Sequence, residues 1–371
     1  MLFRILTTLH LNFNKSDTRK LIDLISFLTF FSFLKQKFDK LKFIDLSESG
    51  LIISPDFTGV LNLEKLTLSR CQNLRELHPS IGILKKLVLL DLYSCENLMC
   101  LPNTICSLKS LECLDLSLCS NIDNLPENLG NLKGLKQLDL TATAIKELPP
   151  SIEGLATLTS LTLHDCKNLV RLPSTICSLS SLQRLFLCGC SNFDNLPENL
   201  GNLKGLSDLD LRGTAIKEFP SSIEGLTTLN LLNLTNCKNL VCLPSTICSL
   251  SSLRRLYLYG CSNFDNLPEN LGNLKGLSDL DLSGTAIKEF PSSIEGLTTL
   301  NLLNLTNCKN LVCLPSTICS LSSLRRLYFY GCSNFDNLPE NLGNLKGLCE
   351  LDLSGIAIKE FPSSIEGLTT L

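Results

Sequence analysis

The 371-residue sequence is poor in the side chains and motifs on which catalysis depends. It has only three histidines, His10, His78 and His164, and it lacks the glycine-rich phosphate-binding loops GxxxxGKS/T and GxGxxG. The GxSxG turn that presents a nucleophilic serine is also missing. Carboxylates such as Glu269 and Glu340 recur because whole segments are duplicated, which explains them better than paired acid–base work does. We therefore expect a non-enzymatic protein with no catalytic residue, no bound metal and no cofactor.

Blocks of one charge and long apolar runs are missing as well. The formal net charge is −3, with acidic and basic residues interspersed, so we expect no binding to nucleic acid or to a membrane surface. The apolar run over residues 21–34 contains Asp23 and is shorter than the roughly 20 residues that span a bilayer. For residues 1–40 we expect a helical cap over the segment that follows. A signal peptide or anchor, or a misassembled gene, are the alternatives.

Cysteine is abundant, but its pattern does not fit a disulfide framework. Nineteen cysteines are an odd number in a long chain, whereas small secreted domains use dense, even sets. We interpret the thiols as reduced and the protein as intracellular, in the cytoplasm or nucleus. The spacing of Cys237, Cys242 and Cys248 is superficially that of a metal site. We expect these three thiols on a buried column, a loop and the convex face, where they cannot converge on one ion.

From Leu41 onward one pattern, LxxLxLxxCxxLxxLPxxIxxLxx, recurs in register. Its fourteen copies, of 22 to 24 residues, begin at Leu41, Leu63, Leu87, Leu111, Leu135, Leu158, Leu182, Leu206, Leu229, Leu253, Leu277, Leu300, Leu324 and Leu348. This consensus and period are typical of leucine-rich repeats. We predict an α/β fold, a right-handed leucine-rich-repeat solenoid over residues 41–371. Each repeat should contribute one short parallel strand and, on the convex side, a short helical turn.

Each position of the repeat has a physical reason. The alternation in LxxLxL places leucines inward and the residues between them outward on a strand, and stacking buries the leucines that no single repeat can bury. The proline lacks an N–H and ends the extended pairing, while the I-x-x-L spacing after it suits a helical turn. The ninth position is mostly Cys, with some Thr, which fits a buried column of small side chains with a weak donor.

The sequence also has a longer period, because blocks of three repeats, 71 residues long, recur along the chain. Segments 229–299 and 300–370 differ only at Leu258/Phe329, Ser278/Cys349, Asp279/Glu350 and Thr285/Ile356. Such similarity indicates a recent internal duplication. The duplicated segments include the outward-facing strand residues. These residues line the concave face, which is the usual binding surface of solenoids.

Candidate partner-binding residues lie on this concave face. They are Arg184, Phe186, Arg255, Tyr257, Tyr259, Arg326, Tyr328 and Tyr330. Tyrosine and arginine are the side chains most enriched at interface hot spots, which favours contact with a protein partner. The alternative is that the arginines form lateral ion pairs with the next strand. Those pairs would be Arg184–Asp208, Arg255–Asp279 and Arg326–Glu350. Exposed pairs of this kind contribute at most about 1 kcal/mol each, and both interpretations stay open.

Several short motifs in residues 41–371 also resemble those of a known protein family. The sequences PDFTG at 55–59, HPSIG at 78–82 and the repeated TAIKE, with Cys in place of the ladder Asn, closely resemble plant TIR-type nucleotide-binding leucine-rich-repeat disease-resistance proteins. The resemblance implies an intracellular immune receptor. Its repeats would recognise a pathogen effector or a guarded host protein and would contact the nucleotide-binding domain within the same polypeptide.

The chain departs from that family in one major respect. The TIR domain and the phosphate-binding loop are absent, so no nucleotide-binding residue carries over. Because the chain stops at Leu371 in mid-repeat, we expect it to be part of a longer protein. The alternatives are a stand-alone intracellular adaptor and an extracellular receptor-like solenoid. The latter usually has Ile before the repeat proline, where this sequence has Leu or Phe, as at Leu243 and Phe290.

Overall fold

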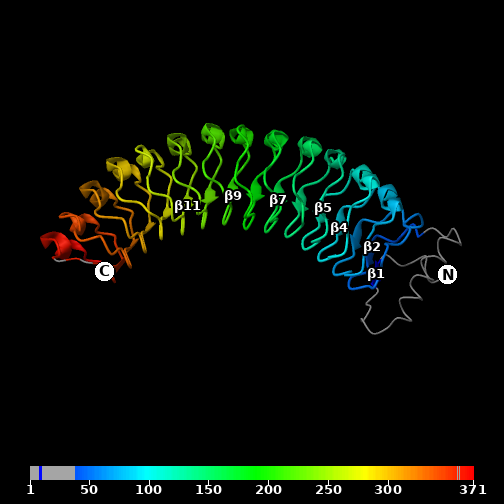
Figure 1. The fold of residues 1–371 in the computed structure, drawn as a ribbon, viewed down its shortest axis with the longest axis horizontal. Helices are drawn as coiled ribbons and strands as arrows, with labels where there is room; N and C mark the ends of the chain where they lie inside the picture. The colour runs from blue at the N-terminus through cyan, green and yellow to red at the C-terminus, as the bar shows by residue number, and fades with distance from the viewer. Residues whose placement is uncertain (1–7, 11–37, 357, 359) are drawn as a thin grey trace. The chain divides into compact units, whose positions relative to one another are not determined.

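The computed structural model describes residues 8–10, 38–356, 358 and 360–371. The chain divides into two compact units, Met1–Leu185 and Phe186–Leu371. Within each unit, short strands follow one another in sequence order and pair in parallel. The strands lie on one side of each unit and short 3-10 helical turns on the other (Figure 1). This confirms the predicted leucine-rich-repeat solenoid with one parallel strand per repeat.

The first unit contains strands β1 (Thr8–His10), β2 (Phe43–Asp45), β3 (Lys65–Thr67), β4 (Leu89–Asp91), β5 (Cys113–Asp115), β6 (Gln137–Asp139) and β7 (Ser160–Thr162), with β8 (Arg184–Phe186) at the boundary. Its 3-10 turns are η2 (Pro79–Ile83), η3 (Asn103–Ser107), η4 (Leu129–Asn131), η5 (Pro150–Gly154) and η6 (Ser174–Ser178).

The second unit contains strands β9 (Asp208–Asp210), β10 (Leu231–Asn233), β11 (Arg255–Tyr257), β12 (Asp279–Asp281), β13 (Leu302–Asn304), β14 (Arg326–Tyr328) and β15 (Glu350–Asp352). Its 3-10 turns are η7 (Leu200–Asn202), η8 (Ser221–Gly225), η9 (Ser245–Ser249), η10 (Leu271–Asn273), η11 (Ser292–Gly296), η12 (Ser316–Ser320), η13 (Leu342–Asn344) and η14 (Ser363–Gly367).

Strand β1 lies inside the segment for which a helical cap was expected. It pairs in parallel with β2, with Thr8 opposite Phe43 and His10 opposite Asp45. The sequence carries the signal for this strand, because LTTLHL at residues 6–11 has the LxxLxL spacing. The rest of the expected cap, residues 1–7 and 11–37, lies outside the described residues. The division into a cap over residues 1–40 and a repeat domain over residues 41–371 stays a prediction.

The repeat proline starts the helical turn, as its chemistry predicts. Pro244 has φ −65° and ψ 150° and forms the N-cap of η9. Its carbonyl accepts from the Ile247 N–H at 3.0 Å, and the Ile247 carbonyl accepts from Leu250 at 3.1 Å. These bonds join residues three apart, which gives a tight 3-10 turn rather than an α-helix. The strand leucines between such turns are fully buried, as at Leu256.

The ninth position of the repeat forms the expected buried ladder. The Cys261 thiol donates to the Leu234 carbonyl of the preceding repeat at 3.0 Å, and Cys237 donates to Leu211 at 3.0 Å. Where threonine replaces cysteine, as at Thr285, the hydroxyl donates to a carbonyl of its own repeat. Small donors therefore satisfy carbonyls that face the interior. Cys242 is exposed and Cys248 is buried on η9, so these thiols occupy the three separate places expected from the sequence.

Buried thiols on the 3-10 turns should make the fold sensitive to alkaline pH. Burial raises the pKa of Cys248 and Cys319 to about 11, against 9.0 for a free thiol. A folded-state pKa above the unfolded value gives stability that is present below pH 9 and is lost as pH rises toward 11. We expect the melting temperature to fall over this window. A Cys248→Ala/Cys319→Ala variant should lose less than the wild type in thermal melts across the same pH series. Equal losses would contradict this assignment.

Glycine in the LGN turns is required by close approach between repeats. A Cβ on Gly272 would lie 1.8 Å from the Ser293 carbonyl oxygen of the next repeat, and this backbone atom cannot move aside. We expect Gly272→Ala to lower the free energy of unfolding by about 1–3 kcal/mol, a typical cost of overpacking. Urea denaturation measures the change, and Lys275→Ala, an exposed position in the same repeat, serves as the control. An unchanged urea midpoint for Gly272→Ala would show that the repeats can separate at no cost.

Candidate protein-binding surface on the strand face

The outward side chains of the strands, here called the strand face, carry the predicted site residues. Arg184 is exposed and Phe186 half-buried on β8. In the second unit, β11 and the residues after it present Arg255, Tyr257 and Tyr259, here called the first strip. Strand β14 presents the second strip, Arg326, Tyr328 and Tyr330. Three strand steps separate the two strips, about 14 Å at the usual spacing of ~4.8 Å.

In both strips the second tyrosine is more exposed than the first. Tyr259 is 52% exposed and Tyr330 is 50% exposed, while Tyr257 and Tyr328 are half-buried. Strands β10 and β13 supply only a leucine and an asparagine to the same outward positions. The tyrosines are therefore the largest apolar surfaces on this part of the strand face, and each aromatic ring can bury roughly 150–250 Å² against a partner.

The lateral ion pairs of the alternative interpretation are wrong for both strips. Strand register sets Arg255 beside Asp279 and Arg326 beside Glu350. Within the described residues, however, neither arginine comes within 4.0 Å of that carboxylate. Arg326 instead lies 4.0 Å from Asp279, two strands back. Register fixes the backbone neighbours, but the long arginine side chain is free to point along the solenoid in either direction.

Both arginines turn toward the repeat before them. Arg255 donates to the Asn230 side-chain oxygen at 3.4 Å, and Arg326 donates to that of Asn301 at 3.3 Å. In the second strip the Tyr328 hydroxyl donates to Glu350. This hydrogen bond, together with burial, raises the pKa of Tyr328. Glu350, which the alternative interpretation pairs with Arg326, is thus hydrogen-bonded to Tyr328. The guanidinium groups of both arginines stay on the surface.

A row of carboxylates on the first unit was not anticipated from the sequence. Asp91, Asp115 and Asp139 stand opposite one another on β4, β5 and β6. Burial and the neighbouring aspartates raise the pKa of Asp115. Each carboxylate accepts from the backbone N–H two residues later, at 3.0, 2.8 and 2.9 Å. This local bond ends the strand, so the row has a structural role. The recurrence of LxxLD in consecutive repeats was its signal in the sequence.

Comparison with known proteins places these repeats in a family. The family model described as "Leucine-rich repeat region" matches residues 115–192, 185–263 and 231–336, and a "Zer-1-like, Leucine-rich repeats" model matches residues 54–125. The chain belongs to the leucine-rich repeat proteins. Among the described residues, no helix has the length and hydrophobicity needed to cross a membrane.

The relatives of this leucine-rich repeat protein include plant disease resistance proteins. It is 40% identical over 336 residues to the TMV resistance protein N of Nicotiana glutinosa, covering 89% of this chain and 23% of that protein. It is 34% identical over 168 residues to a probable disease resistance protein of Arabidopsis thaliana, covering 44% of this chain and 9% of that protein. The resemblance inferred from the sequence is confirmed. The chain spans less than a quarter of the length of either relative.

Solved structures confirm the fold. A leucine-rich repeat protein of Leptospira interrogans superposes with a TM-score of 0.65 at 30% identity, covering 89% of this chain and 94% of that one. The functional domain of InlJ from Listeria monocytogenes, which includes a cysteine ladder, superposes with a TM-score of 0.60 at 18% identity, covering 84% and 62%. The latter likeness extends to the fold alone.

The tyrosine–glutamate hydrogen bond of the second strip can be measured against its own copy. Tyr328 donates to Glu350, whereas no hydrogen bond joins Tyr257 to the shorter Asp279 within the described residues. A double-mutant cycle with Tyr328→Phe and Glu350→Gln should give a coupling of about 1 kcal/mol in the free energy of unfolding. The matched cycle with Tyr257→Phe and Asp279→Asn should give almost none. Equal coupling in both cycles would mean that the two strips do not differ in this tyrosine–carboxylate hydrogen bond.

Proposed function

We propose that this leucine-rich repeat protein is the recognition region of an intracellular plant immune receptor and binds a protein partner on its strand face. The partner would be a pathogen effector or a host protein that the receptor guards. The observation that carries the proposal is the duplicated arginine–tyrosine strip, with Tyr259 and Tyr330 half exposed beside strands that offer only leucine and asparagine. The leucine-rich-repeat fold is in general a non-enzymatic interaction scaffold, and the relatives are named as disease resistance proteins.

The energetics of the strips support binding over a purely structural role. The Arg326–Asp279 contact of 4.0 Å joins partly exposed groups and contributes little to folding. An arginine that is weakly held in the free protein retains its donors for a partner. Tyrosine and arginine together account for most interface hot spots, because they combine large contact area with hydrogen bonding. Two such strips about 14 Å apart can contact a single protein surface.

Other properties of the whole receptor follow from the same proposal. The curated relatives are much longer than this chain, which covers 23% of one and 9% of another. We place the chain beside a nucleotide-binding module within a longer polypeptide, which the repeats would contact. The repeats themselves would bind neither nucleotide nor metal and would catalyse no reaction, and the protein would reside in the cytoplasm or nucleus.

The decisive experiment removes the tyrosine rings and keeps the fold. A Tyr257→Ala/Tyr328→Ala variant should still fold because both side chains face outward, and it should lose only the Tyr328–Glu350 hydrogen bond, about 1 kcal/mol. It should lose about 2 kcal/mol of binding free energy per residue, the size of a hot-spot contribution. The measurement is pull-down from infected leaf extract with quantitative mass spectrometry, followed by calorimetry with the purified partner. A partner retained by the wild type and lost by this variant supports the proposal.

The control variant changes the opposite side of the same repeats. Lys275 and Lys346 follow the 3-10 turns η10 and η13, away from the strand face. A Lys275→Ala/Lys346→Ala variant should bind the partner like the wild type. If the tyrosine variant kept full affinity while the lysine variant lost it, recognition would belong to the helical-turn side and the strand-face assignment would be wrong.

A further inference from the structure

The internal duplication places the same three donor side chains twice on the strand face of the second unit. The first donor set is Asn233, Arg255 and Tyr257, on β10 and β11, and the second donor set is Asn304, Arg326 and Tyr328, on β13 and β14. In each set the asparagine stands opposite the tyrosine, and the arginine lies two residues before the tyrosine on the same strand. Adjacent strands are about 4.8 Å apart, so the three side chains share one small area. Each set therefore serves as a control for the other.

The asparagines show the first difference between the sets. The Asn304 amide donates to the Ser283 hydroxyl in a long hydrogen bond of 3.5 Å. Before the first set, Arg212 stands at the position of Ser283 and pairs with Asp210 at 2.7 Å. Among the described residues, no acceptor engages the amide N–H groups of Asn233, whose oxygen accepts a backbone N–H at 3.1 Å. The Asn233 amide is thus held in place with its donors unused.

The arginines differ in the same sense. Arg326 is half-buried and lies 4.0 Å from the Asp279 carboxylate, two strands back. The carboxylate two strands before Arg255 is that of Asp208, which accepts from the Ser207 hydroxyl at 2.6 Å. In the part of the chain that the structure describes, no ion pair within 4.0 Å joins Arg255 to Asp208 or Asp279. Arg255 is exposed, and its charge has no internal carboxylate beside it.

The tyrosines differ most clearly. The Tyr328 hydroxyl donates to Glu350, but within the described repeats no acceptor takes the proton of the Tyr257 hydroxyl. Burial and, to a lesser degree, the Asp279 carboxylate raise the pKa of Tyr257. The hydroxyl of Tyr257 therefore keeps its proton at neutral pH and can donate it to a group outside the chain.

Two of the four differences between the duplicated segments produce this contrast. In the first segment the Ser278 hydroxyl donates to the Asp279 carboxylate at 2.8 Å. In the second segment Cys349 replaces Ser278, and its thiol turns to the Gly347 carbonyl at 3.3 Å. Glu350, longer by one methylene than Asp279 and without the serine donor, bonds to the tyrosine instead. The same two substitutions can therefore be exchanged between the segments by mutation.

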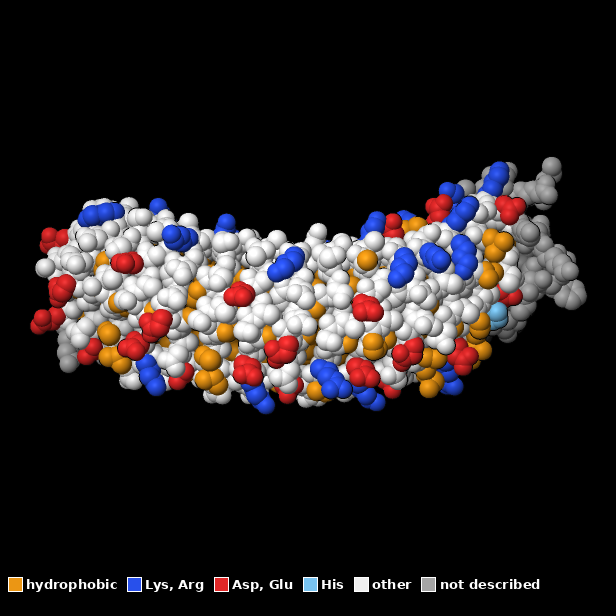
Figure 2. All heavy atoms as spheres, turned by 90° about the horizontal axis from the view of Figure 1, so that it is seen from above, with side chains coloured by type: hydrophobic (Ala, Val, Ile, Leu, Met, Phe, Trp, Pro, Cys, Tyr) orange, Lys and Arg blue, Asp and Glu red, His pale blue; other side chains and the backbone are white. Residues whose placement is uncertain are grey.

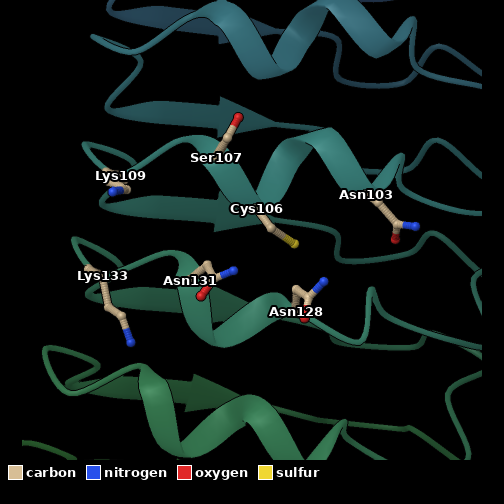
Figure 3. A pocket seen from close by; sticks show the side chains of 7 residues that line it. All are labelled: Asn103, Cys106, Ser107, Lys109, Asn128, Asn131 and Lys133. Carbon is tan, nitrogen blue, oxygen red and sulfur yellow. The ribbon is translucent and has the colours of Figure 1, made fainter.

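The helical-turn side offers no such contrast between copies. Acidic and basic side chains are both scattered over it (Figure 2). The open pocket between η3 and η4 has donors spread along both turns, such as Asn103 at the start of η3 and Lys109 after its end (Figure 3). Over the described ranges, Asn131 and its copy Asn273 are equally without a side-chain hydrogen bond. Unused donors distinguish one copy from the other on the strand face, not there.

We propose that Asn233, Arg255 and Tyr257 together bind one carboxylate side chain, Asp or Glu, of the protein partner. A guanidinium, a phenol hydroxyl and a carboxamide supply one positive charge and several N–H and O–H donors, which match the single charge and two oxygens of a carboxylate. The second donor set, whose groups are engaged within the protein, contributes the contact area of its tyrosine rings. This inference rests on the proposed function and names the group that the first strip recognises.

The test is calorimetry of the full chain with the purified partner that the wild type retains from infected leaf extract. Tyr257→Phe should raise the Kd about tenfold, because a hydrogen bond to a charged group is lost. The matched control Tyr328→Phe should leave the Kd unchanged, because that hydroxyl is committed to Glu350. Ser278→Cys/Asp279→Glu, which recreates the second segment, should raise the Kd as much as Tyr257→Phe does. Combining it with Tyr257→Phe should add no further loss.

The partner supplies the complementary measurement. Its acidic residues are changed one at a time from Asp to Asn or from Glu to Gln. One such change should weaken binding about tenfold and should add nothing to Tyr257→Phe. The inference is overturned if no acidic residue behaves in this way, or if Tyr257→Phe and Tyr328→Phe have equal effects. If the Tyr257→Ala/Tyr328→Ala variant loses the partner in that case, the strand-face assignment survives and only the carboxylate site fails. If this alanine variant binds like the wild type, both proposals fail.

Discussion

No repeat of this chain can exclude water from its own leucines, so burial depends on contact between successive repeats. Leu256 and Leu280 are fully buried on adjacent strands, and they stand directly opposite each other. The same contact holds the strands in parallel, residue-for-residue register. Every position of the consensus therefore becomes a row along a unit, and the outward rows become surfaces whose composition is set one residue per repeat.

Stacking restricts some rows far more than others. The ladder row holds mainly small side chains that can donate to a carbonyl, as Cys261 and Thr285 do, although Ile356 occupies the same position in the last repeat. The turn row accepts glycine at Gly272, where the next repeat approaches too closely for a Cβ. Outward strand positions and the residues after the 3-10 turns face no such limit. Variation can accumulate there without loss of the fold, and the candidate binding surface lies in the outward strand rows.

Sequence reasoning succeeded where backbone and burial determine the outcome. Strand positions, the turn after each proline and the cysteine ladder follow from the consensus, because each is imposed by stacking. It missed β1, although LTTLHL at residues 6–11 has the right spacing, since the atypical sequence around it concealed the repeat. Its alternative interpretation paired Arg326 with the wrong carboxylate. Ion pairing depends on the directions of long surface side chains, which a repeat period does not encode.

The duplication copied the strip, but the two copies differ in one hydrogen bond. Between Asp279 and Glu350 the second copy gains one methylene, and with it the carboxylate reaches the Tyr328 hydroxyl. The hydroxyl proton of Tyr328 is therefore already committed within the protein. Tyr257 has no such bond to Asp279, and its pKa is raised chiefly by burial. The two strips present nearly the same area and charge but different hydrogen-bonding capacity. Repetition thus reproduces the shape of the surface, while a single substitution makes the two copies chemically distinct.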